Sequence, residues 1–118
     1  MSYKHPIDTS FISTQIGESP EILVEMSEVF LEVLKEYQVS MQEAIAANDF
    51  SAIHLHAHKI KPSLSMFGLN GILEMILVIE KAAHFDQDLV KIIEYSRKIE
   101  KELPLIYHQV SEIIEVHN

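Results

Sequence analysis

The chain has 118 residues, the length of one ordinary domain, and 47% of them are hydrophobic, so we expect a packed core rather than disorder. Its formal charge is −9, with 18 acidic against 9 basic residues and no cluster of lysines, which argues against a nucleic-acid partner. The absence of cysteine excludes disulfides, thiolate metal sites and cysteine nucleophiles, and it fits a cytoplasmic protein.

The N-terminal stretch predicts a short helix and no targeting sequence. Met1–Ser10 is polar and does not have the form of a signal peptide. Residues 8–16 fit a short helix that is capped by Asp8 and ended by Gly17. The longest unbroken apolar run of the chain, Met75–Ile79, is far too short to cross a bilayer, so we expect no membrane contact.

Two longer amphipathic helices follow. The first begins at Pro20, capped by Ser19, and reaches about Ala47. Asp49 caps the second, and Gly68 ends it. Apolar residues at spacings of three and four form the inward faces of the two helices: Leu23, Met26, Phe30, Val33, Tyr37, Met41 and Ala44 on the first, and Phe50, Ile53, Ala57, Ile60, Leu64 and Phe67 on the second.

Two more helices complete the chain. The third runs from Leu69 or Asn70 to Ala83, and residues 84–87 form the next turn, with Asp86 as the expected cap. The last helix carries an apolar stripe over residues 89–113. Because that stripe resumes in register after Pro104, we expect a kink there rather than a break.

The predicted fold is all-α. Only 3 glycines and 4 prolines interrupt the chain, which favours a few long elements. Four amphipathic helices with short loops predict an up-down-up-down antiparallel four-helix bundle with a short extra N-terminal helix. We expect one domain over residues 1–118, with an N-terminal segment at 1–17 and the bundle at 19–117, and a monomer, because four helices can bury their apolar faces among themselves.

His58 is the candidate functional residue. On a helical wheel it lies roughly 130° from the centre of the apolar stripe of its helix, so it should face solvent. His54, Lys61 and Ser65 fall within roughly 60° of one another and of His58. Leu55, Pro62 and Met66 also lie on the side away from the core; they form either a docking surface or a contact with a neighbouring helix.

An exposed imidazole beside a lysine suits a phosphoryl carrier. Imidazole is the side chain whose neutral, nucleophilic form is abundant near pH 7. Lys61, one helical turn away, can stabilise the negative charge of a transferred phosphoryl group. Apolar neighbours give a partner protein something to bury.

The sequence around His58 resembles the histidine-containing phosphotransfer (HPt) domains of two-component phosphorelays. That family places a small residue before the histidine, then an aliphatic residue, Lys, Gly, Ser, and a Gly about ten residues after the histidine. The matching residues here are Ala57, His58, Ile60, Lys61, Ser63 and Gly68. The resemblance extends over nearly the whole chain, including Ser19-Pro20-Glu21 and Glu80-Lys81-Ala82-Ala83.

The resemblance implies what the domain does and with whom. His58 would accept a phosphoryl group from an aspartyl phosphate of a response-regulator receiver domain, or of a hybrid sensor histidine kinase, and donate it to another receiver. The receiver would supply the Mg²⁺ and most catalytic groups, so the chain would be a carrier rather than an enzyme, with no cofactor of its own. The sequence contains no Gly-rich phosphate loop, which is consistent with this.

Pro62 departs from the family pattern, which usually has Gly there. Proline removes the amide that would bond the carbonyl of His58, four residues earlier. We therefore predict a local bend, or a water molecule on that carbonyl, beside the phosphorylation site.

Alternatives remain for several of these residues. A degenerate domain could dock receivers without being phosphorylated. His54 could share a metal with His58, as histidines at i and i+4 do, but no third ligand is compelling, so we expect no metal site and a supporting role for His54. Ser63 lies on another side of the wheel from His58 and could bond the backbone or a neighbouring helix.

Overall fold

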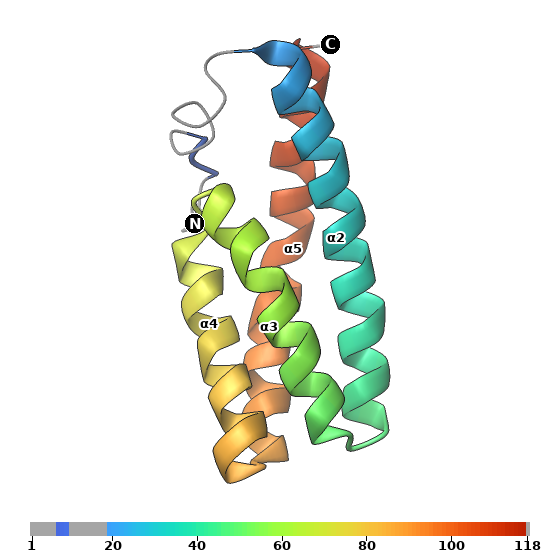
Figure 1. The fold of residues 1–118 in the computed structure, drawn as a ribbon, viewed down its shortest axis with the longest axis vertical. Helices are drawn as coiled ribbons and strands as arrows, with labels where there is room; N and C mark the ends of the chain where they lie inside the picture. The colour runs from blue at the N-terminus through green and yellow to red at the C-terminus, as the bar shows by residue number, and fades with distance from the viewer. Residues whose placement is uncertain (1–6, 10–18, 118) are drawn as a thin grey trace.

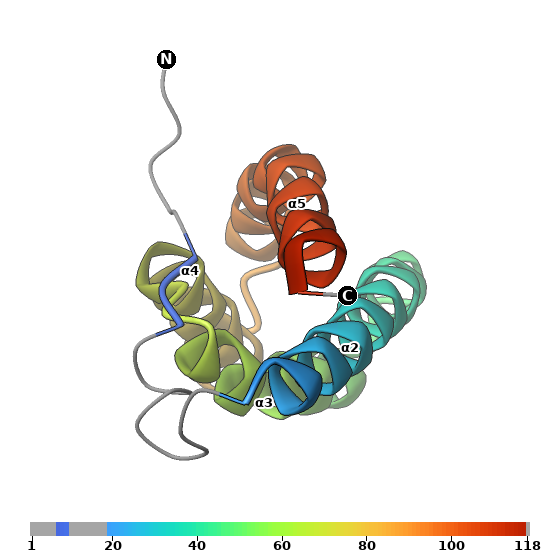
Figure 2. The ribbon, with the colours of Figure 1, turned by 90° about the horizontal axis from the view of Figure 1, so that it is seen from above.

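The structure is a computed structural model that describes residues 7–9 and 19–117, and these residues form helices and no strand. Its α-helices are α2 (Pro20–Ala46), α3 (Phe50–Met66), α4 (Asn70–Lys81) and α5 (Leu89–His117). Consecutive helices run in opposite directions, and the view from above shows them arranged around a common core (Figures 1 and 2). The predicted antiparallel four-helix bundle is confirmed.

The short helix predicted over 8–16 lies almost entirely outside the described residues. Only residues 8 and 9 of it are described, and they are not helical.

Side-chain caps start the first two long helices as the sequence predicts. The Ser19 hydroxyl accepts a hydrogen bond from the amide of Ile22 at 3.4 Å, and Pro20 takes the first helical position. The Asp49 carboxylate accepts one from the amide of Ala52 at 3.0 Å. These bonds satisfy amides that the first turn of a helix leaves without an intrahelical partner.

The core fixes which face of α3 points outward. Ile53, Ala57, Ile60 and Leu64 are at most 3% exposed, and together they form the inward stripe of that helix. At its end Phe67 stacks on Phe30 of α2, with ring centroids 4.3 Å apart and planes only 8° from parallel. Residues between the stripe positions, including His58, must therefore face away from the core.

The connection between α4 and α5 differs from the expected turn. A π-helical segment, η1 (Ala82–Asp86), follows α4 directly, and Gln87 then adopts a left-handed conformation with φ of 49°. The cap of α5 is Asp88, which accepts from the amide of Lys91 at 3.1 Å, so the prediction of Asp86 as the cap was wrong. The π turn explains why the cap lies at residue 88 rather than 86, because it extends the helical backbone to Asp86. Ala82 and Ala83 are both buried within it.

Gly68 ends α3 in the left-handed region, with φ of 69°. The amide of Asp8 donates a hydrogen bond to the carbonyl of Phe67 at 3.0 Å, which brings the N-terminal segment against this turn. A Cβ atom on Gly68 would lie 2.6 Å from the Cβ of Asp8. Both the backbone conformation and the close approach therefore require glycine here.

Neither internal proline breaks its helix. Pro62 lies within α3 and Pro104 within α5, and both helices continue beyond them. The bend predicted beside Pro62 and the kink predicted at Pro104 remain predictions. No helix in the described ranges is both long enough and apolar enough to cross a membrane.

Candidate functional site

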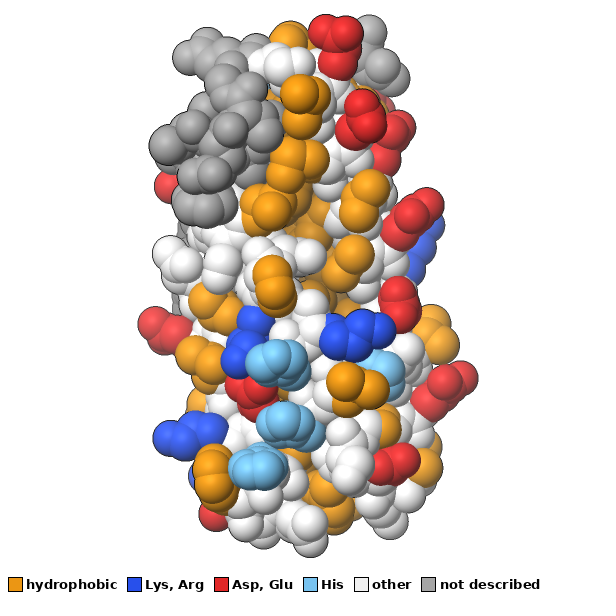
Figure 3. Space-filling view, viewed as in Figure 1, with side chains coloured by type: hydrophobic (Ala, Val, Ile, Leu, Met, Phe, Trp, Pro, Cys, Tyr) orange, Lys and Arg blue, Asp and Glu red, His pale blue; other side chains and the backbone are white. Residues whose placement is uncertain are grey.

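His58 stands on the outer face of α3, as the helical wheel predicts. Its side chain is 63% exposed, while the preceding residue, Ala57, is completely buried. The small Ala57 side chain lets α3 lie close to its neighbours, and the next position along the helix turns the imidazole to solvent. Imidazole side chains gather on this face of the molecule, next to lysine and hydrophobic side chains (Figure 3).

Glu80 of α4 reaches across to α3 and binds two residues of the predicted site. Its Oε2 lies 2.9 Å from Nδ1 of His58, and its Oε1 accepts a hydrogen bond from Nζ of Lys61 at 2.9 Å. The side chain of Glu80 is only 13% exposed. One carboxylate thus holds both the imidazole and the ammonium group in place.

The environment of Glu80 keeps its carboxyl group ionised. Burial tends to raise the pKa of Glu80, but the hydrogen bonds from Lys61 and His58 and the charges of these two residues outweigh burial. The pKa of Glu80 therefore lies below its ordinary value of 4.5. At neutral pH the group is a carboxylate, which can only accept hydrogen bonds.

This carboxylate determines which ring nitrogen of His58 is free. Since the carboxylate accepts, Nδ1 of the neutral imidazole carries the proton, and the lone pair lies on Nε2. The ring contacts Glu80 through Nδ1, and 63% of the His58 side chain is exposed to solvent. The geometry therefore presents Nε2 as a nucleophile.

Sequence reasoning missed Glu80 as a partner of His58. The residue directly follows the buried Ile79, which places it at the edge of the apolar face of α4. This position in the sequence could have predicted that the Glu80 carboxylate is partly buried. The sequence does not say, however, which neighbouring helix this edge meets.

Lys61 contacts Glu80, a partner that the sequence analysis did not predict. Its side chain is 27% exposed and forms an ion pair with Glu80 rather than extending freely into solvent. The ammonium group remains near the imidazole, because both bind the same carboxylate.

His54 and His84 extend the cluster away from Lys61. Nε2 of His54 lies 3.8 Å from Oε2 of Glu80, and its ring centroid lies 6.2 Å from that of His58 and 5.0 Å from that of His84 in η1. His84 is exposed, but its ring contact with His54 shows that it is more than a solvated surface residue. Within residues 7–9 and 19–117, no three His, Cys, Asp or Glu side chains are arranged to hold a metal ion.

The other flank of His58 is more apolar and lies toward α2. Leu55 is 52% exposed and Pro62 is exposed, whereas Met66 is half-buried against the core and lines a hollow with Val29 of α2. Of the three predicted docking residues, two are thus freely accessible. Met66 presents only part of its side chain.

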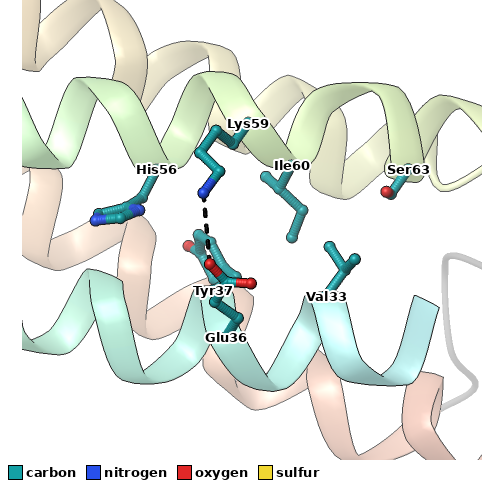
Figure 4. Close-up of a pocket in the computed structure, with 7 residues that line it drawn as sticks. All are labelled: Val33, Glu36, Tyr37, His56, Lys59, Ile60 and Ser63. Atoms are coloured by element: carbon teal, nitrogen blue, oxygen red, sulfur yellow. Dashed lines mark hydrogen bonds and ion pairs between the residues drawn. The ribbon is translucent and has the colours of Figure 1, made fainter. Parts of the chain in front are cut away.

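Ser63 faces α2 rather than His58. It is half-buried and lines a pocket between α2 and α3 together with Tyr37, His56 and Ile60 (Figure 4). Across the same pocket Lys59 forms an ion pair with Glu36 at 3.4 Å. Ser63 therefore belongs to the contact between two helices, as its place on the wheel allowed.

Comparison with known proteins gives one match. The sequence pattern of a family described as the Hpt domain matches residues 25–112, well over half of the chain. A search of curated proteins gives no match, and a search of solved structures gives none. The matched range includes α3 with His58, α4 with Glu80 and most of α2 and α5.

Proposed function

This chain belongs to the Hpt domain family, and from that premise we propose that it relays a phosphoryl group between aspartates of receiver domains through a phosphohistidine at His58. Membership of the family implies histidine phosphotransfer in a two-component phosphorelay and interaction with receiver domains. The observation that carries the assignment to His58 is its geometry: an imidazole that is 63% exposed and whose Nδ1 binds Glu80, which leaves Nε2 as the ring nitrogen with the lone pair.

The transfer step follows from that geometry. The lone pair on Nε2 of His58 attacks the phosphorus of an aspartyl phosphate; the N–P bond forms as the P–O bond breaks, and its electron pair leaves on the aspartate. The ring becomes cationic, because Nδ1 keeps its proton. Glu80 is placed to stabilise this developing positive charge through the Nδ1 hydrogen bond. Donation to the next receiver is the reverse of this step.

Lys61 has two tasks in this scheme. Its ammonium group holds Glu80, and thereby the imidazole, in position. It also provides positive charge beside His58, where the phosphoryl group arrives. His54 supports the same carboxylate from one helical turn away.

The partner supplies the rest of the chemistry. A receiver domain, free or part of a hybrid sensor histidine kinase, brings the Mg²⁺ and most catalytic groups, so the chain acts as a monomeric carrier with no cofactor of its own. Leu55, Pro62 and the accessible part of Met66 provide apolar surface for this partner to cover.

Phosphoryl transfer from a labelled receiver tests the proposal. The protein is incubated with a receiver that carries radiolabelled aspartyl phosphate and Mg²⁺, and we expect acid-labile, base-stable label on the chain. H58Q should take up no label, while H56Q, which alters a half-buried histidine on the α2 side of the same helix, should be labelled normally. A wild-type chain without label, or label that survives in H58Q, rejects the proposal; receiver binding without label would instead identify a degenerate docking domain.

A further inference from the structure

A row of aromatic rings extends from His58 on α3 to Phe85 in η1. The ring of Phe85 meets that of His84 edge to face, with centroids 4.5 Å apart and planes 84° from parallel. His84 contacts His54, whose ring lies nearly parallel to that of His58. Each ring centroid is thus within 6.2 Å of the next.

Phe85 is the exposed end of this row. It is 72% exposed, although a phenyl ring is among the side chains with most to gain from burial. The π-helical turn accounts for its position, because η1 buries Ala82 and Ala83 in succession and then turns the next residues, His84 and Phe85, outward. Single π turns occur frequently at functional sites.

Packing limits the freedom of this ring before any partner arrives. The edge-to-face contact with His84 restricts the phenyl group, and His84 is itself placed against His54 of α3. A side chain that is ordered in advance loses less conformational entropy on binding than a mobile one. An exposed, pre-positioned aromatic ring is the kind of residue that is enriched in protein interfaces.

We infer that Phe85 is an anchoring residue for the receiver domain that exchanges phosphoryl groups with His58. This inference rests on the proposed function, because transfer requires the receiver to cover Nε2 of His58. A stable interface buries about 800 Å² on each partner, a patch on the order of 30 Å across. With each ring so close to the next, Phe85 falls inside a footprint of that size centred near His58.

The closeness of Phe85 to His58 favours a receiver over a second copy of this chain as the binding partner. Self-association across the aromatic row would cover His58 and prevent it from meeting an aspartyl phosphate. A receiver that buries Phe85, by contrast, is brought to the open side of the imidazole by that contact. The receiver would then contact Phe85 on one side of His58 and the apolar residues Leu55, Pro62 and Met66 on the other.

Truncation of Phe85 tests the inference. The full chain with F85A is compared with wild type for its affinity for an unphosphorylated receiver and for the rate of transfer from the phosphorylated receiver. We expect affinity and kcat/KM for transfer to fall at least tenfold, with partial recovery in F85L. Labelling of His58 by phosphoramidate, a small donor that needs no docking surface, should be unchanged, and so should the thermal unfolding midpoint.

Val116 offers a matched control, since it is 78% exposed and lies near the end of α5, away from η1. V116A should bind and transfer like wild type.

Three results would overturn the inference. They are normal receiver binding by F85A, an equal loss of affinity in V116A, and a loss of phosphoramidate labelling in F85A, which would mean that the substitution impairs His58 itself. Light scattering that shows a wild-type dimer converted to a monomer by F85A would assign the ring to self-association. Receiver affinity is measured without transfer, so it tests the role of Phe85 alone. The proposed function fails by a different result, namely a wild-type chain that takes up no label.

Discussion

Glu80 is the residue on which the chemistry of His58 depends. Its carboxylate holds the proton on Nδ1 and orients the ring, and in the proposed transfer it would face the positive charge that develops there. We expect E80A to slow transfer from a phosphorylated receiver by about a hundredfold, since electrostatic stabilisation by one such group contributes on that order. E80Q should be less impaired, because its amide oxygen can still accept from Nδ1. Single-turnover transfer rates measure both effects, and equal rates for all three proteins would contradict the assigned role.

The lowered pKa of Glu80 also predicts how stability depends on pH. The unfolded chain binds a proton at Glu80 more readily than the folded chain, so the stability that this carboxylate contributes is fully present above its ordinary value of 4.5. It is lost as the pH falls through the lower folded pKa. We expect E80Q to be less stable than wild type by about 1 kcal/mol at pH 7, with the difference shrinking toward pH 3. Urea denaturation at a series of pH values measures this, and a difference that grows on acidification would contradict it.

Gly68 predicts a stability effect that sequence spacing alone does not explain. G68A forces a left-handed backbone on alanine and places its Cβ against Asp8, so we expect a loss of about 1–3 kcal/mol in the free energy of unfolding. G71A is the control, because Gly71 lies inside α4 without a positive φ, and alanine there should be neutral or slightly stabilising. Chemical denaturation of both variants compares the two sites. The motif identified Gly68 as important, but its steric reason became visible only with the contact to Asp8.

At the scale of the helix, Pro62 is the unusual element of α3. P62A restores the amide that can bond the carbonyl of His58, so we expect the free energy of unfolding to rise by up to about 3 kcal/mol. P104A restores the equivalent bond in α5, far along the chain from His58, and should stabilise without altering transfer. If the absence of the hydrogen bond to the His58 carbonyl changes the orientation of the imidazole, P62A will change the transfer rate and P104A will not. If P62A and P104A have the same effects on stability and on the transfer rate, Pro62 has no special role at the site.

The starts of α2 and α3 were predictable, whereas the end of α4 and the cap of α5 were not. Ser19 and Asp49 cap their helices through local hydrogen bonds that depend on residues only three positions away. The π turn at Ala82–Asp86 accompanies the burial of two adjacent alanines, Ala82 and Ala83, in the finished bundle, and such burial depends on tertiary packing. An α-helical period carries no signal for a π turn, so the pattern predicted a helix that ends at Ala83 and a turn capped by Asp86.

For the whole molecule, periodicity predicted four helices, their inward faces and their antiparallel order. It placed His58 on the outside of α3 because that requires only the geometry of one helix. The pairing of His58 with Glu80 requires knowledge of which edges of α3 and α4 face each other, and the apolar stripes leave this open. The same limit applies to the ring contact between His54 and His84, which joins α3 to η1.

The contact between His58 and Glu80 links the proposed activity to folding. His58 and Glu80 are 22 residues apart in the chain and meet only when α3 and α4 have docked. An unfolded or half-assembled copy still contains the histidine, but it lacks the carboxylate that holds the proton on Nδ1 and orients the ring. If His58 is the phosphoryl acceptor, as proposed, its competence is therefore acquired together with the tertiary structure. In the proposed relay, unfolded copies should therefore accept a phosphoryl group more slowly than folded ones.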